Sequence, residues 1–184
     1  GATPFAVYTA AFALLLSRVS GQDDIVLGAP VAGRAHDETL GLVGCFADTA
    51  ALRIRLDSAT DGAGLVEAVQ AELGRALSNP APFDALVEAL GVPRETSVTP
   101  VFQAMIAFTE AEQPAVDFAG ASAAPILVHP GTAKFDLQLQ MLRQDGLVRC
   151  GLEYASDIFD HATAEALAVR YERVLAWLSS GTAG

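Results

Sequence analysis

The chain has 184 residues, of which 52% are hydrophobic and 18% are charged, and its formal net charge is −11 at pH 7. These proportions are typical of a folded domain with a core and exclude a disordered chain. The excess of acidic residues argues against a surface that follows nucleic-acid phosphates, and no apolar run reaches the roughly 20 residues of a membrane span. We therefore expect one globular unit over residues 1–184 that binds neither nucleic acid nor membrane.

The first half of the chain shows helical and strand periodicities in turn. Thr3 and Pro4 have the form of a helix cap and a first helical residue, and Gly21 has the form of a helix end. The turn GAPVAGR, at residues 28–34, follows a short run that is typical of a buried strand. The expected elements are a helix over 5–19, strands over 24–27 and 49–56, and helices over 64–77 and 83–90.

The second half predicts strands and a closing helix. Clean alternation begins at Phe135, Asp145-Gly146 is a hairpin turn, and Asp160 caps the last helix. Between strands the segment 109–130 has a weak pattern and is expected to be a long excursion. The expected strands are 101–108, 126–128, 135–141 and 148–154. This order predicts an α/β fold of two layers, a mixed sheet with helices packed on one face.

Cys45 and Cys150 lie in apolar segments, which predicts small core residues in a reducing compartment, with a disulfide as the alternative. No basic region precedes Phe5, so no secretory signal is indicated and the cytoplasm is the expected location. The chain opens directly on a helix signal, which indicates a piece of a longer protein.

The residues do not form a self-sufficient catalytic set. The spacing from Gly28 to Arg34 imitates a phosphate-binding P-loop, but it lacks the lysine and the hydroxyl residue that the P-loop needs. His36 belongs to a contiguous acidic run, which is more typical of a solvated loop than of a metal site, and His129 and His161 are isolated. Asp48 begins a strand, where it either acts as an acid or base or bonds nearby amides. No metal site is predicted.

Several blocks, in order, resemble the second half of the condensation domains of nonribosomal peptide synthetases. SGQDDIVLGAPVAGR resembles the opening of the family's second lobe, and GLVGCFADTAALR resembles its "IGxFVNTLxLR" block. PFDALVEAL resembles "HQDxPFExLVEAL", and RETSVTPVFQAMIAF resembles "RDxSRNPLFQVMF". GTAKFDLQLQM and LEYASDIFD also fit, so the resemblance covers nearly the whole chain.

The resemblance implies one lobe of a CoA-dependent-acyltransferase-like fold. In that family two lobes form a V, and donor and acceptor carrier proteins send phosphopantetheine arms into a tunnel between them. The catalytic histidine belongs to an HHxxxDG motif on the first lobe, and this sequence has no HHxxxDG. The implied function is one tunnel wall of an amide-forming parent, with the first lobe and the two carrier proteins as partners, no directly bound cofactor, and 109–130 containing a crossover between lobes.

The residues implied to line the tunnel are Gly28, Pro30, Gly33, Arg34, Asp48, Thr132 and Asp136, and none is implied to be catalytic. Small residues at the turn would let a thin pantetheine arm pass against the backbone. In an isolated lobe the apolar face toward its companion would be exposed, which predicts self-association.

Departures from the family pattern leave other functions open. Asp48 replaces an asparagine, Ser78, Asn79 and Pro80 replace HQD, and Val98-Thr99 replaces Arg-Asn. The alternatives are a noncatalytic lobe that docks a carrier protein or a tailoring enzyme, an epimerisation-type relative, and a small-molecule acyltransferase of the same superfamily.

Overall fold

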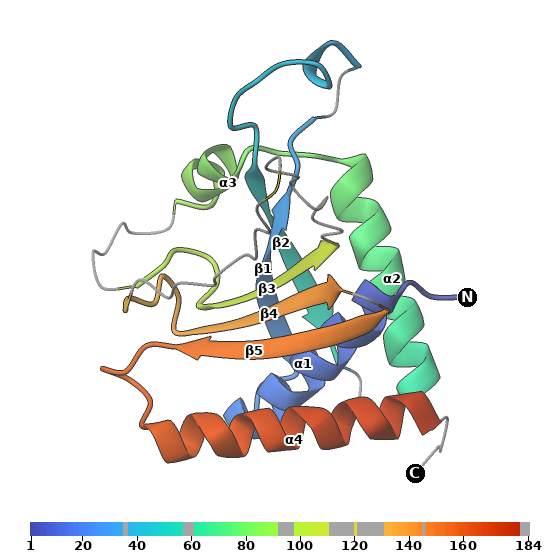
Figure 1. Ribbon diagram of the computed structural model, residues 1–184, viewed down its shortest axis with the longest axis vertical. Coiled ribbons are helices and arrows are strands. Elements are labelled where there is room, and N and C mark those ends of the chain that lie inside the picture. Colours follow the sequence, from blue (N-terminus) through green and yellow to red (C-terminus); the bar gives the residue numbers. More distant parts are fainter. Residues whose placement is uncertain are drawn as a thin grey trace.

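The computed structural model describes residues 1–34, 37–56, 61–91, 98–110, 120, 131–144 and 146–180. A five-stranded sheet has the strand order β2-β1-β3-β4-β5 (Figure 1). The strands are β1 (Asp24–Val31), β2 (Asp48–Arg55), β3 (Ala104–Glu110), β4 (Leu137–Gln144) and β5 (Leu147–Tyr154), and the helices are α1 (Pro4–Ser20), α2 (Gly62–Ser78), α3 (Phe83–Leu90) and α4 (His161–Ser180). A 3-10 turn, η1 (Asp37–Thr39), lies between β1 and β2.

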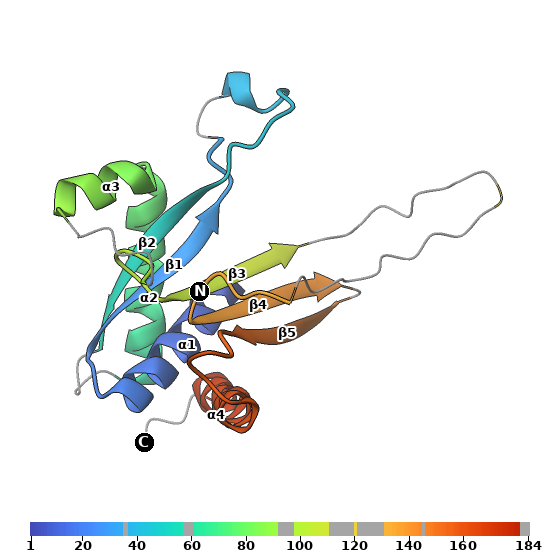
Figure 2. The ribbon, with the colours of Figure 1, turned by 90° about the vertical axis from the view of Figure 1, so that its left-hand side faces the viewer.

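The sheet is mixed, as predicted. β1 pairs with β3, and β3 with β4, in parallel, whereas the outer pairs β1–β2 and β4–β5 are antiparallel. Helices α1, α2 and α4 pack on one face of this sheet (Figure 2), and α3 lies apart from that layer and contacts β2. The α/β two-layer class and the likeness to the acyltransferase-like lobe are therefore confirmed.

The ends of the helices follow the sequence signals. The Thr3 hydroxyl accepts a hydrogen bond from the amide of Ala6, and Gly21 ends α1 in a left-handed conformation with φ 71°. Asp61 caps α2 by accepting from the amide of Gly64 at 2.8 Å, and Asp160 caps α4 by accepting from Thr163 at 2.6 Å. These caps satisfy amides that have no partner within the helix.

The core lies between the sheet and the helices. Alternate residues of each strand point into it, and fully buried examples are Leu27, Leu52 and Ile106. On the helix side, Phe12 is 1% exposed, and its ring packs edge-on against Tyr171 of α4. Burial of these side chains supplies the main stabilisation of the lobe.

Two expectations about the strands are corrected. β1 runs on to Val31, so residues 28–31 are strand and not turn. Pro30 has no backbone N–H to donate. It is tolerated there because β1 pairs with β3 only at Leu27 and Gly28, so no hydrogen bond to β3 is lost at Pro30. Val101 lies outside β3 and has a φ of 73°, which a strand residue does not adopt.

The cysteines are also not core residues. Cys45 and Cys150 are free thiols in exposed residues, so neither the core assignment nor the disulfide is correct. Cys45 lies in the excursion between β1 and β2, and Cys150 lies on β5, an edge strand. Cys150 lines a small cavity between β5 and α4 and is only partly covered by that helix.

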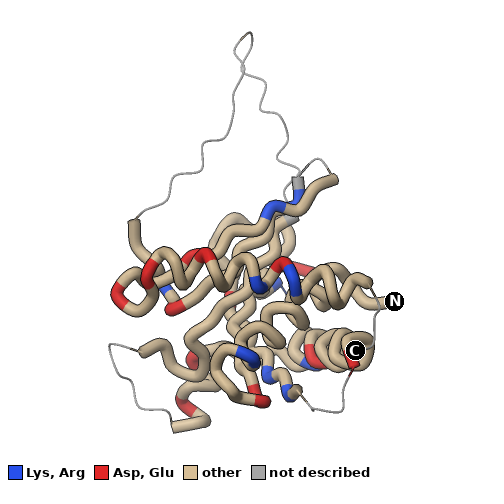
Figure 3. Tube along the Cα trace, turned by 90° about the horizontal axis from the view of Figure 1, so that it is seen from below, with Lys and Arg blue, Asp and Glu red and all other residues tan. Residues whose placement is uncertain are grey.

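Other expectations concern residues outside the described part of the chain. These are the strand at 126–128, most of the crossover segment 109–130, and the residues His36, His129 and Asp145. No helix of the described residues is long and apolar enough to cross a membrane. Acidic and basic residues are interspersed along the described chain (Figure 3).

Candidate functional site

The sheet face that points away from α1, α2 and α4 carries Gly28 at its centre. The strand register places Ala51, Met105 and Gln138 beside Gly28 across neighbouring strands, on the same face. Gly28 is buried because the ring of Phe102 lies directly on it. A Cβ at this position would lie 2.3 Å from Phe102 Cε2, so only glycine fits beneath the ring.

Phe102 belongs to an aromatic cluster with Phe83 and Phe135. The Phe102 ring is 5.3 Å from that of Phe83 and 5.7 Å from that of Phe135, measured between centroids, and Phe102 is 2% exposed. Tilted rings at these separations attract one another in addition to the area they bury. The cluster therefore ties α3 and the segment before β4 to the centre of the open sheet face.

Asp136 and Asp48 are both connected to this cluster. The amide of Asp136, which follows Phe135, donates to the carbonyl of Gln103 at 3.1 Å. The Asp48 carboxylate accepts from its neighbour Thr49 at 2.7 Å and from the amide of Phe83 at 3.4 Å. Asp48 thus joins the start of β2 to the first residue of α3, which confirms the expectation that it bonds nearby amides.

Gly33 and Arg34 lie away from the cluster, in the loop between β1 and β2. Gly33 has a φ of 62°, and a Cβ there would lie 1.7 Å from the carbonyl oxygen of Phe46. The Arg34 guanidinium donates to the carbonyl oxygens of Thr39 and, at 3.3 Å, of Gly44. It also stacks on the Phe46 ring at 4.4 Å from the centroid. In this structure Arg34 holds its own loop together.

The tip of the same loop presents apolar side chains to solvent. Leu40, Leu42 and Val43 are 65%, 55% and 105% exposed. Contiguous exposed apolar side chains are typical of surfaces that meet another protein or domain. The Arg34 contacts fix the base of this loop and so fix where its tip projects.

Three of the predicted site residues are therefore brought together and the others are not. Gly28, Asp48 and Asp136 meet at the aromatic cluster, whereas Gly33 and Arg34 form the separate loop base. Pro30 and Thr132 are exposed. The expectation that all these residues line a tunnel stays a prediction, but at Gly28 the close neighbour is Phe102 itself, so an arm would pass over Phe102 and not against Gly28.

Sequence reasoning missed the aromatic cluster. The sequence pattern predicts only a helix start at Phe83 and a strand residue at Phe135, and it includes Phe102 only within a motif. A signal was present, since three phenylalanines each lie beside a predicted boundary of an element, where core periodicity does not require an aromatic ring.

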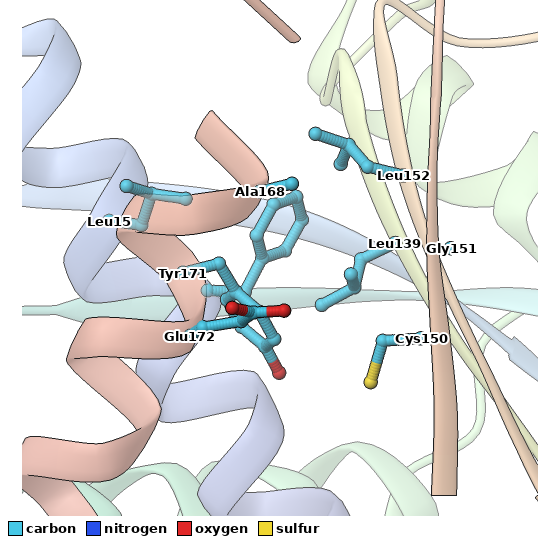
Figure 4. A pocket seen from close by; sticks show the side chains of 9 residues that line it. Leu15, Leu139, Cys150, Gly151, Leu152, Ala168, Tyr171 and Glu172 are labelled. Carbon is cyan, nitrogen blue, oxygen red and sulfur yellow. The ribbon is translucent and has the colours of Figure 1, made fainter. Parts of the chain in front are cut away.

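A small cavity opens between β5 and α4 (Figure 4). Its volume is about 60 Å³ and its walls include Leu139, Cys150, Tyr171 and Glu172. Burial, followed by the nearby Glu172 carboxylate, raises the pKa of the Cys150 thiol, and burial also raises the pKa of Tyr171. Both groups are thus held in their neutral forms, which disfavours a nucleophilic role.

Comparison with known proteins identifies the family. The family model described as "Condensation domain" matches residues 1–183. The chain belongs to the condensation-domain family. Malpinin synthetase of Mortierella alpina is 37% identical over 166 residues, which are 90% of this chain and 2% of that protein. Gramicidin S synthase 2 of Brevibacillus brevis is 33% identical over 176 residues, 95% of this chain and 4% of that protein.

Solved structures of condensation domains share the fold. The X-domain in complex with OxyB from teicoplanin biosynthesis is 28% identical with a TM-score of 0.82, over 98% of this chain and 41% of that chain. A four-domain nonribosomal peptide synthetase bound to AMP and glycine has a TM-score of 0.88 at 21% identity, over 100% of this chain and 15% of that one. The chain spans only a small share of the length of the curated relatives that it matches.

Proposed function

We propose that this chain is the second lobe of a condensation domain and forms one wall of the channel between two lobes. The observation that carries the proposal is the combination of a family match over residues 1–183 with a sequence that has no HHxxxDG motif. The 41% share of the X-domain chain that it covers supports the same division. The reactive histidine would then lie on the companion lobe.

The parent reaction would join two acyl units held on carrier proteins. The amine of the acceptor unit attacks the thioester carbonyl of the donor unit, the new C–N bond forms as the C–S bond breaks, and the donor carrier's thiol leaves. Condensation domains act with carrier proteins whose phosphopantetheine arms hold these thioesters. The arms are substrates here, and no residue of this chain is proposed to bind one covalently.

Within that channel this lobe would act by shape. The aromatic cluster of Phe83, Phe102 and Phe135 seals the centre of the open sheet face, and exposed Pro30 and Thr132 offer the surface along which an arm could lie. The apolar loop tip at residues 40–43 would meet the companion lobe or a carrier protein. Self-association of the isolated lobe would use the same exposed surfaces.

A chimera tests the proposal. The second lobe of a condensation domain of gramicidin S synthase 2 is replaced by this chain, and amide formation is followed by intact-protein mass spectrometry with that domain's own carrier-loaded substrates. We expect product from the chimera and none when the second histidine of the companion's HHxxxDG is replaced by alanine. A folded chimera that binds both loaded carriers and yields no product would contradict a catalytic parent.

The second candidate is a noncatalytic docking lobe. The X-domain from teicoplanin biosynthesis, which forms a complex with OxyB, is 28% identical to this chain and shares its fold with a TM-score of 0.82. The same chimera separates the two candidates, because a docking lobe would fold and bind a partner without supporting amide formation.

A further inference from the structure

A groove lies where three helix ends meet, on the helix side of the molecule and away from the open sheet face. It is formed by the start of α1, the start of α2 and the end of α4. Its volume is about 370 Å³, which falls within the range of sites that hold small organic groups. Its walls include Val7, Asp61, Val66, Glu67, Trp177 and Leu178.

Trp177 is a half-buried wall of this groove and is fixed by close packing. A Cβ on Gly62 would lie 3.2 Å from both Cη2 and Cζ3 of the indole, so the six-membered ring rests on the first residue of α2. Gly62 is the residue that permits this approach. The indole is therefore held in one place, with part of its surface exposed to the groove.

The charged side chains around the groove are both carboxylates. Asp61 uses Oδ1 to cap α2, and Glu67 lies almost two turns along the same helix. No lysine or arginine is among the described residues that line the groove, and within the described part of the chain no salt bridge is formed by Glu67. A groove lined by an indole and two carboxylates is complementary to an organic cation.

We propose that this groove binds an arginine or lysine side chain presented by another polypeptide segment. The planar guanidinium stacks on an indole and pairs with carboxylates at the same time, which makes arginine the better fit of the two. The apolar side chains of Val7, Val66 and Leu178 would cover the methylene stem. This inference does not depend on whether the parent catalyses amide formation.

Trp177 makes the test direct because it is the sole tryptophan of the chain. N-acetyl-arginine amide is titrated into the chain at constant ionic strength while the indole fluorescence is recorded, and N-acetyl-citrulline amide, which has the same shape without the charge, is the matched control. The chain is used with its N-terminus acetylated, because Ala2 lines the groove and the ammonium of Gly1 would otherwise compete. We expect a saturable change in the millimolar range with the arginine probe only.

The double variant Asp61→Asn, Glu67→Gln tests the carboxylates. Asparagine caps a helix as well as aspartate does, so the fold should be kept, and circular dichroism verifies it. We expect at least fivefold weaker binding, whereas Asp37→Asn with Glu38→Gln, the same charge change in η1, should alter it less than twofold. Equal responses to arginine and citrulline, a response that does not saturate, or a double variant that binds like the parent chain would each overturn the proposal.

Discussion

Replacing Gly28 by alanine should destabilise the lobe through one identified clash. The new Cβ would lie 2.3 Å from Cε2 and 2.4 Å from Cζ of Phe102, where ordinary contacts are 3.4–4 Å. Phe102 would have to retreat by more than an ångström. It has little room to do so, because it is 2% exposed and lies between Phe83 and Phe135.

The loss of stability in Gly28→Ala can be estimated from other substitutions that overpack a core. Forcing one extra carbon into a packed core costs about 1–3 kcal/mol, and we expect the upper part of that range for Gly28→Ala. Phe102→Ala alone should cost about 3–5 kcal/mol, since it removes a buried ring. In the Phe102→Ala background the Gly28→Ala change should be close to neutral, because the atoms it would strike are absent.

Urea unfolding of the four proteins, followed by far-ultraviolet circular dichroism, measures this cycle. The expected coupling energy between positions 28 and 102 is about 1–3 kcal/mol. The effects of substitutions at independent sites add to within roughly 0.5 kcal/mol, so this coupling would be clearly resolved. If Gly28→Ala destabilises the lobe equally with and without the Phe102 ring, that ring is not what requires glycine at position 28, and the account of the open sheet face is wrong.

Three further changes test the loop and the last helix. Gly33→Ala places a Cβ 1.7 Å from the Phe46 carbonyl oxygen at a φ of 62° and should cost about 1–3 kcal/mol in urea unfolding. The control Gly74→Ala in α2, where no atom lies within 4 Å, should instead stabilise by about 0.5–1 kcal/mol, because alanine has the higher helix propensity. Arg34→Lys removes the forked bonds to the loop carbonyls and should speed proteolysis of residues 37–45 several-fold; unchanged cleavage would rule out the clamp. The backbone hydrogen bond from Thr163 lowers the pKa of Asp160 from its ordinary 3.8, so its contribution to stability is present above that value and is lost as pH falls through the lower, folded pKa. Asp160→Asn keeps the cap and should remove that part of the acid dependence of unfolding.

The sequence predicted the elements whose signals are local. As predicted, α1 begins after Thr3, with Pro4 as its first residue, and ends at Gly21. Helix α3 runs over Phe83–Leu90, also as predicted, and ends at Gly91 in a left-handed conformation. A cap, a proline or a glycine acts within a few residues, so its effect can be read without knowledge of the rest of the fold.

Features that depend on contacts between distant segments could not be predicted in the same way. The continuation of β1 to Val31 depends on pairing with β2, which runs past Pro30 as far as Asp48. Glycine is required at position 28 by the ring of Phe102, which lies 74 positions later in the chain. The role of Arg34 depends on where the loop places the carbonyl oxygens of Thr39 and Gly44. The separation of the predicted site residues into a cluster and a loop base therefore required the structure.

The central claim is that this chain is one lobe whose reactive histidine lies on a companion. The most direct measurement supplies carrier-loaded aminoacyl thioesters to this chain alone, to the parent's first lobe alone, and to the two mixed, and follows amide formation by mass spectrometry. We predict no product from this chain alone and product from the mixture. Amide formation by the isolated chain would contradict the claim.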